Sequence, residues 1–297
     1  MSTEPTHLTP PEFAAMKARG EKIVMVTAYD TPGARLADEA GVDIVFVGDS
    51  AANNVLGYDG TTPISMDEMV MLARAARRGT HRAFFLVDMP LGSFQVSDEE
   101  AVRNAVRFVK DAGAEGVKLE GGGSSAARAR AIVAAGIPVM GHIGLTPQSA
   151  SMLGGLKAQG RTAAKARQLY ADAQALQAAG CFAIVLEAVP ARVALRISES
   201  LRIPTIGIGA GRDCDGQVLV WHDLLGITEG VTPRFVKRYA NLAAETRQAL
   251  ETFTAEVRSG AFPADEHTYK IPESELALFE SELDSGVMAG DASGDWF

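Results

Sequence analysis

The sequence predicts an α/β protein whose simplest architecture is a (β/α)8 TIM barrel. Apolar runs rich in Val, Ile and Phe alternate with segments of helical composition, and this alternation predicts a parallel sheet. About eight strand–helix units in roughly 250 residues match the size of such a barrel. A doubly wound parallel sheet is the alternative, because the same alternation also builds that fold.

Eight apolar runs are expected to form the strands. In chain order they span residues 23–28, 44–48, 84–87, 116–119, 137–141, 183–186, 204–208 and 218–220, and the last has the weakest pattern. The helical segments are rich in Ala, Leu, Arg, Glu and Gln and span residues 66–79, 98–112, 124–135 and 162–179. The long connections at 51–65 and 143–161 are expected on the catalytic face, where long loops tend to be functional.

A short helix is expected before the first strand. Thr9-Pro10-Pro11-Glu12 has the pattern of a capping box with Pro at the first helical position, and Gly20 provides a stop. We expect this helix to cap the lower mouth of the barrel.

We expect one catalytic domain over residues 1–270, followed by an acidic C-terminal extension over 271–297. The extension holds seven acidic residues and no Lys or Arg, so it accounts for most of the formal net charge of −9. Within it, 273–284 is expected to form a short acidic helix, and 285–297 to be disordered or docked on a neighbouring subunit.

The composition also excludes several classes of protein. No basic stripe is present, which argues against nucleic acid as a partner. The start of the chain lacks the regions of a signal peptide, and no run approaches a membrane span. Two cysteines, Cys181 and Cys214, make neither a disulfide framework nor a zinc site. We therefore expect a cytoplasmic enzyme that acts on small molecules.

Three of the predicted strands end on a carboxylate, namely Asp49, Asp88 and Glu120. In parallel α/β folds the C-terminal ends of the strands form the active site. Three acids gathered there repel one another unless a positive charge joins them, and Mg²⁺ prefers such oxygen ligands. Each acid taken alone is equally typical of a turn or a helix cap, so the prediction of a metal site depends on the three together.

Lys118 and Glu120 are two residues apart in one strand, so their side chains point to the same side. Burying both charges inside a barrel is costly unless they are paired or bind something. A buried pair with a purely structural role is the alternative to a functional one.

Two further polar residues end predicted strands. His142 is either a hydrogen-bonded packing residue or a polar residue that supports the site. Glu187 brings a fourth acid to the same face, where it is a candidate general base, with helix capping or a salt bridge as the alternative.

The chain resembles the ketopantoate hydroxymethyltransferase (3-methyl-2-oxobutanoate hydroxymethyltransferase) family over roughly residues 8–268. The similar segments are TAYD (27–30), VGDS (47–50), GYDGTTPI (57–64), RRGT (77–80), VDMPLGSF (87–94), VKLEGG (117–122), GHIGLTPQS (141–149), KAQGR (157–161), VLEAVP (185–190), IPTIGIGAG (203–211) and DGQVLVWHDLLGI (215–227).

This resemblance implies a barrel of the phosphoenolpyruvate/pyruvate superfamily type and a homodecamer of two pentameric rings. It implies a one-carbon transferase of pantothenate biosynthesis. Such an enzyme transfers a hydroxymethyl group from 5,10-methylenetetrahydrofolate to 3-methyl-2-oxobutanoate, through a Mg²⁺-stabilised enolate, and gives 2-dehydropantoate. It also implies that Asp49, Asp88 and Glu120 bind Mg²⁺. The keto acid is expected to contact Asp49, Ser50, Asp88 and Lys118, and Glu187 is expected to accept the proton. His142 is expected to have a supporting polar role.

The chain departs from the family pattern at three places. Residues 51–54 read Ala-Ala-Asn-Asn where Leu-Gly-Met is usual, Leu156 stands where an aromatic residue is common, and residues 269–297 extend beyond the usual end. The first departure alters the loop beside the expected metal, and the second bears on folate contacts.

Two other functions are compatible with a barrel of this kind. One is another Mg²⁺-dependent keto-acid lyase or mutase of the same superfamily, although the lyases use a cysteine-bearing loop that this sequence lacks. The other is a non-catalytic oligomeric barrel, which would be expected to have lost at least one acid of the set.

Overall fold

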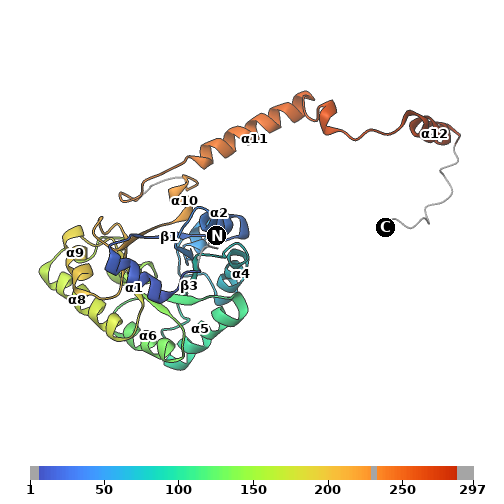
Figure 1. The fold of residues 1–297 in the computed structure, drawn as a ribbon. Helices are drawn as coiled ribbons and strands as arrows, with labels where there is room; N and C mark the ends of the chain where they lie inside the picture. The colour runs from blue at the N-terminus through green and yellow to red at the C-terminus, as the bar shows by residue number, and fades with distance from the viewer. Residues whose placement is uncertain (1–6, 229–232, 286–297) are drawn as a thin grey trace. The chain divides into compact units, whose positions relative to one another are not determined.

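The computed structural model describes residues 7–228 and 233–285. Eight parallel strands close into a barrel in the order β1 to β8, and β8 pairs with β1 (Figure 1). The strands are β1 (Ile23–Thr27), β2 (Ile44–Val47), β3 (Phe84–Asp88), β4 (Gly116–Glu120), β5 (Val139–Gly144), β6 (Ala183–Glu187), β7 (Thr205–Ile208) and β8 (Gly216–Leu219). The predicted barrel is confirmed, and the doubly wound alternative is wrong.

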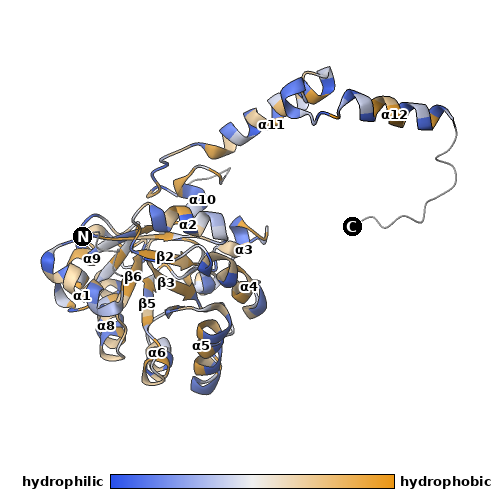
Figure 2. Ribbon diagram, turned by 45° about the vertical axis from the view of Figure 1, so that its right-hand side comes forward, coloured by the Kyte–Doolittle hydropathy of each residue, from blue (hydrophilic) through white to orange (hydrophobic). Residues whose placement is uncertain are grey.

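All four helices predicted between the strands are present. The helices of the barrel are α1 (Pro10–Arg19), α2 (Thr31–Glu39), α3 (Ala51–Asn54), α4 (Met66–Arg77), α5 (Asp98–Ala112), α6 (Ser124–Ala134), the 3-10 turn η1 (Pro147–Ser149), α7 (Ala150–Leu153), α8 (Ala163–Ala178), α9 (Ala191–Ser200) and α10 (Trp221–Leu224). The larger helices surround the strands (Figure 1). Their polar faces turn outward, and the strands they cover are largely hydrophobic (Figure 2).

Two local predictions were wrong. Thr9 makes no side-chain cap on α1, and Glu12 pairs instead with Arg19 across the exposed side of the same helix. Strand β5 runs on to Gly144, so His142 lies inside the strand rather than at its end.

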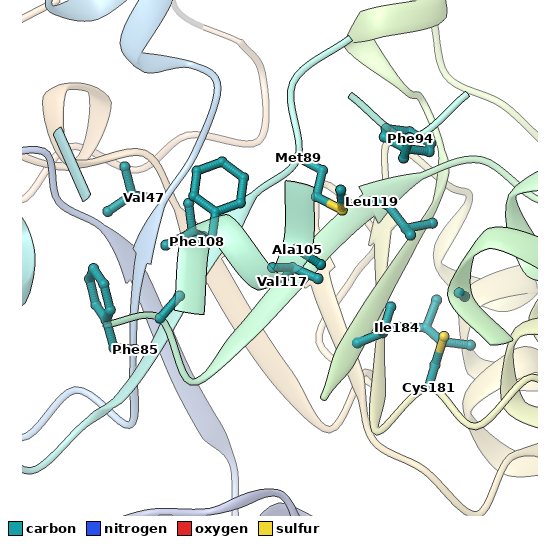
Figure 3. Packing of buried hydrophobic residues seen from close by; sticks show 14 of the residues in the cluster. Val47, Phe85, Met89, Phe94, Ala105, Phe108, Val117, Leu119, Cys181 and Ile184 are labelled. Atoms are coloured by element: carbon teal, nitrogen blue, oxygen red, sulfur yellow. The ribbon is translucent and has the colours of Figure 1, made fainter. Parts of the chain in front are cut away.

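The side chains of each strand alternate between two apolar layers. Along β3, Phe84 and Leu86 belong to the cluster that fills the barrel, whereas Phe85 and Val87 pack outward against the helices. Figure 3 shows side chains of this outer layer, among them Phe85 of β3 and Phe108 of α5. The alternation decides which residues near the strand ends point into the barrel.

Helix α1 closes one end of the barrel, as the sequence predicts. Its Phe13 is fully buried in the inner cluster and meets the ring of Phe84 edge-on at 5.7 Å. The ring of Phe182 stacks on Phe13 at 6.1 Å. Gly20 ends the helix in the left-handed conformation, with φ of 72°.

The chain divides into two compact units, residues 1–243 and 244–297. The second unit contains most of α11 (Leu242–Ser259), the 3-10 turn η2 (Asp265–His267) and α12 (Glu273–Asp284), which confirms the predicted acidic helix. The expectation for 285–297 falls almost wholly outside the described residues, and a domain boundary near 270 stays a prediction. None of the described helices is long and apolar enough to cross a membrane.

Candidate active site

The C-terminal ends of β2, β3 and β4 bring three buried acids to one end of the barrel. Asp88 and Glu120 are the last residues of their strands, and Asp49 follows β2 after one glycine. Asp88 shares the inward side of β3 with Phe84 and Leu86, so its carboxylate points into the barrel. None of the three acids is more than 5% exposed.

Lys118 lies between these acids. The strand register sets it beside Asp88, and Nζ lies 2.9 Å from Asp88 Oδ1. Nζ also stands 5.3 Å from the ring centroid of Phe46, a cation–π contact. Burial opposes the charge on Lys118, but Asp88, Glu120 and Asp49 outweigh it and raise its pKa. The ammonium group is therefore held charged inside the barrel.

His142 lies between Lys118 and Glu120 on one side and Glu187, the fourth acid, on the other. Its Nδ1 lies 3.2 Å from Lys118 Nζ and 3.5 Å from Glu120 Oε1, and its Nε2 lies 3.2 Å from Glu187 Oε2. Burial and Lys118 lower the pKa of His142, but the two carboxylates overcome them and raise it to about 9. A protonated Nδ1 donates to Glu120, whereas an unprotonated Nδ1 accepts from Lys118, so the two arrangements exclude each other.

Gln148 is a site residue that the sequence reasoning missed. It lies in η1, is 6% exposed, and its Nε2 donates to Asp49 Oδ2 at 2.9 Å and to the carbonyl of Met89 at 3.0 Å. Its backbone N–H donates to Glu120 Oε2 at 3.0 Å. A neutral amide in a loop has no compositional signature, and the only available signal was its place in the GHIGLTPQS segment.

The acids influence one another strongly. Burial, followed by repulsion from Asp88 and Glu120, raises the pKa of Asp49 well above its usual range. Burial also raises the pKa of Asp88, although Lys118 opposes this. Burial acts in the same direction on Glu120, but His142 and Lys118 outweigh it and lower the pKa. Negative charge at this end of the barrel is thus only partly compensated.

These carboxylates could hold a divalent cation. Within residues 7–228 and 233–285, no group of three or more His, Cys, Asp or Glu side chains is arranged as a ready-made metal site. Mg²⁺ does not require one, because it keeps several waters and takes one or two carboxylates. Asp88 Oδ1, apart from its ion pair with Lys118, receives no hydrogen bond from the described residues. The donor set consists of hard oxygens and fits Mg²⁺.

Ser50 directly follows Asp49, at the edge of the cluster of buried acids. Its hydroxyl pairs with the hydroxyl of Tyr29 at 2.8 Å, and burial raises the pKa of Tyr29 to about 12. The ring of His222, from α10, lies 5.6 Å from that of Tyr29. The serine is thereby held by residues that follow β1 and β8.

The unusual segment after Ser50 forms the short helix α3. Ala51 and Ala52 are fully buried, and the side-chain amide of Asn54 donates to the carbonyl of Ser50 at 3.0 Å. The small residues let this turn pack tightly beneath Ser50. Leu156, in contrast, is 72% exposed.

Comparison with known proteins gives consistent results. A family model described as ketopantoate hydroxymethyltransferase matches residues 7–265. The 3-methyl-2-oxobutanoate hydroxymethyltransferase of Moorella thermoacetica is 55% identical over 265 residues, which cover 89% of this chain and 98% of that protein. The proteins of the same name from Thermobifida fusca and Thermotoga neapolitana are 51% and 54% identical, over 88% and 84% of this chain and 93% and 92% of theirs.

Solved structures with a similar fold have much lower identity. A phosphonopyruvate hydrolase in complex with oxalate and Mg²⁺ gives a TM-score of 0.55 at 15% identity, covering 95% of this chain and 99% of that one. A 2,3-dimethylmalate lyase of the phosphoenolpyruvate mutase/isocitrate lyase superfamily gives 0.57 at 14%, covering 95% and 98%. These likenesses confirm the fold predicted from the sequence. On the family match and the curated relatives, the chain belongs to the ketopantoate hydroxymethyltransferase family.

Proposed function

We propose that this chain transfers a hydroxymethyl group from 5,10-methylenetetrahydrofolate to 3-methyl-2-oxobutanoate, giving 2-dehydropantoate for pantothenate biosynthesis. The observation that carries the proposal is the chain of contacts Asp88–Lys118–His142–Glu187 inside one end of the barrel. It joins a candidate proton acceptor to a cluster of buried acids, in a chain about half of whose residues are identical to those of hydroxymethyltransferases.

Asp49, Asp88 and Glu120 would surround Mg²⁺, one or two of them bound to it directly and the others through water. When bound, the cation supplies Lewis acidity that draws negative charge from the carbon next to the keto group. Lys118 supplies a second positive charge, which compensates the carboxylate of the keto acid in a buried site. The raised pKa values of Asp49 and Asp88 favour their neutral forms, and nearby positive charge favours the carboxylates, so these two acids would contact the substrate as carboxylates only with the cation and Lys118 beside them.

Glu187 is the proposed proton acceptor. Its side chain is 15% exposed, more than those of its neighbours, so it borders the space that a substrate enters. His142 lies against Oε2 and leaves Oε1 to face the substrate. Glu187 takes the proton from the carbon next to the ketone, and that carbon then bonds to the one-carbon unit of the folate. Both nitrogen–carbon bonds that join this unit to the folate break, and water supplies the hydroxyl group. The proton removed from the substrate carbon and one proton of the water end on the two folate nitrogens.

Ser50 is proposed to contact the keto acid, and the residues that contact folate are left unassigned. We also propose a homodecamer, as the family resemblance implies. A cytoplasmic location stays a prediction.

The decisive experiment measures exchange of the substrate proton next to the ketone with solvent. 3-Methyl-2-oxobutanoate is incubated with the full chain and Mg²⁺ in deuterated water, and loss of the proton next to the ketone is followed by NMR. The wild type is compared with Glu187→Gln and with the control Glu199→Gln, an exposed acid of α9. Glu187→Gln should lower the exchange rate by a factor of about 10² to 10⁴, whereas Glu199→Gln should match the wild type.

Addition of 5,10-methylenetetrahydrofolate then tests the transfer itself. Product formation would support the proposed reaction. Exchange without transfer would favour another keto-acid reaction of this barrel superfamily, and no exchange in the wild type would contradict the mechanism and favour a non-catalytic barrel.

A further inference from the structure

Gln148 spans the ends of three strands from a single position. Its side-chain amide reaches Asp49 after β2 and the carbonyl of Met89 after β3, and its backbone N–H reaches Glu120 at the end of β4. Both hydrogens of the amide group are used by these acceptors. The side chain is buried, so water does not compete for the bonds.

These bonds engage one oxygen of each of two acids. Oδ2 of Asp49 and Oε2 of Glu120 both accept from Gln148, which leaves Oδ1 and Oε1. The third acid is arranged in a similar way, since Oδ2 of Asp88 accepts from the backbone N–H of Asp49 at 3.3 Å. Each carboxylate therefore has a single oxygen that Gln148 and the backbone after β2 leave unbonded. Of these, Asp88 Oδ1 is paired with Lys118 at 2.9 Å and Glu120 Oε1 lies 3.5 Å from His142 Nδ1, so a cation would share them with these two groups.

The number of oxygens that a carboxylate offers bears on which cation it prefers. Mg²⁺ is small, takes octahedral geometry and uses one oxygen of each carboxylate with several waters. Ca²⁺ is larger, accepts six to eight oxygens and is often bound by both oxygens of a carboxylate. A hydrogen bond to one oxygen opposes bidentate binding.

We propose that Gln148 is a positioning residue that makes Asp49 and Glu120 each present one oxygen, and so favours Mg²⁺ over Ca²⁺. The proposal rests on the metal-binding role of these acids in the proposed function. Glutamate at this position would place another negative charge against Asp49, and asparagine is one methylene shorter. Glutamine has both the reach and the two donors.

The test measures cation binding rather than activity. Mg²⁺ and Ca²⁺ are titrated separately by calorimetry into the metal-free full chain, as wild type and as Gln148→Met, which keeps the length of the side chain and removes its donors. Gln159→Met is the matched control, because Gln159 is similarly buried and, among the described residues, its side-chain amide donates to the Lys157 carbonyl and to no acid. Gln148→Met should weaken Mg²⁺ binding about tenfold, as loss of a bond that orients a metal ligand typically does.

The ratio of the two affinities separates positioning from a merely structural role. Ca²⁺ binding should weaken less than Mg²⁺ binding in Gln148→Met, so the preference for Mg²⁺ should fall, while Gln159→Met keeps the wild-type ratio. Equal loss for both cations, or no loss, would overturn the proposal. If Gln148→Met does not fold, as judged by circular dichroism, Gln148→Asn is used with the same expected sign.

Failure of the proposed function has a different result. A wild type that binds neither cation would remove the metal role of the acids, and with it the role of Gln148. A wild type that prefers Mg²⁺, together with a Gln148→Met variant that keeps the same preference, would remove only the role of Gln148.

Discussion

His142 Nε2 lies 3.2 Å from Glu187 Oε2, and this contact crosses from β5 to β6 inside the barrel. The imidazole is buried and lies between Glu120 and Glu187. Its contact with Glu187 is one of charge, because Nε2 makes no hydrogen bond to the described residues. A base whose orientation is fixed in this way holds its free oxygen in one place. We infer that His142 positions Glu187 rather than reacting itself.

Replacing His142 by Asn should therefore slow catalysis more than it weakens substrate binding. The shorter side chain loses the contact with Glu187, and misplacement of a reacting group by about 1 Å costs around 10²-fold in rate. The rate of proton exchange should fall by about that factor, while KM for the keto acid should change less than threefold. Steady-state NMR exchange rates at several substrate concentrations separate the two effects.

The exposed His81 provides the control, since His81→Asn should behave as wild type. A rise in KM at unchanged maximal rate in His142→Asn would contradict the positioning role and point to direct binding of the substrate.

The buried pair of Lys118 and Asp88 should stabilise the metal-free protein. Lys118→Met removes the only ammonium group described beside the acids and leaves Asp88 unpaired beside Asp49. Breaking a buried pair from one side costs about 3–5 kcal/mol. Urea unfolding without divalent cations should show a loss of that size, against a change within about 0.5 kcal/mol for the exposed Lys110→Met. Equal stability of Lys118→Met and wild type would mean that the pair makes no net contribution.

The end of the barrel at which the buried acids gather could be predicted largely from strand endings. Asp88, Glu120 and Glu187 each follow an apolar run, and side chains alternate along a strand, so residues that end such runs in parallel strands meet at one end of the barrel. The inward direction of Lys118 could be predicted from that of Glu120, because side chains two residues apart in a strand point to the same side. The topology of the barrel then brings these strands together without further information.

Other contacts of the site and of the helix ends depend on distances between residues in the folded chain, and no local sequence pattern predicts them. Gln148 is placed by the path of the chain after β5, and apart from its membership of the GHIGLTPQS segment its sequence context is that of a surface glutamine. Thr9-x-x-Glu12 has the letters of a capping box, but Arg19 offers Glu12 a charged partner on the same helix, so the box does not form. At Ser65 and Glu68 a box forms at the start of α4.

The lower end of the barrel should be the most sensitive part of the apolar core. Phe13 contacts both Phe84 and Phe182 and is fully buried, so Phe13→Ala removes a large side chain where the barrel wall cannot collapse inward. Replacing a buried Phe by Ala typically lowers the free energy of unfolding by about 3–5 kcal/mol. Tyr269→Ala, at a fully exposed aromatic residue, should stay within about 0.5 kcal/mol in the same urea unfolding experiment. A small loss in Phe13→Ala would mean that α1 is not part of the cooperative core.

Gly144 should be essential for the position of Glu187, the proposed proton acceptor. It ends β5 beside Glu187 with φ of 100°, and a Cβ atom there would lie 2.2 Å from the Glu187 carbonyl oxygen. Gly144→Ala must therefore displace the β6 end that carries the base, in addition to the cost of the backbone conformation. Gly136 also has positive φ but open space around it, so Gly136→Ala isolates the backbone cost of about 1–2 kcal/mol. We expect the Gly136 variant to keep its exchange rate and the Gly144 variant to lose most of it while still folded by circular dichroism. Equal exchange rates in the two variants would contradict Glu187 as the proton acceptor, because displacement of the base would then leave the reaction unaffected.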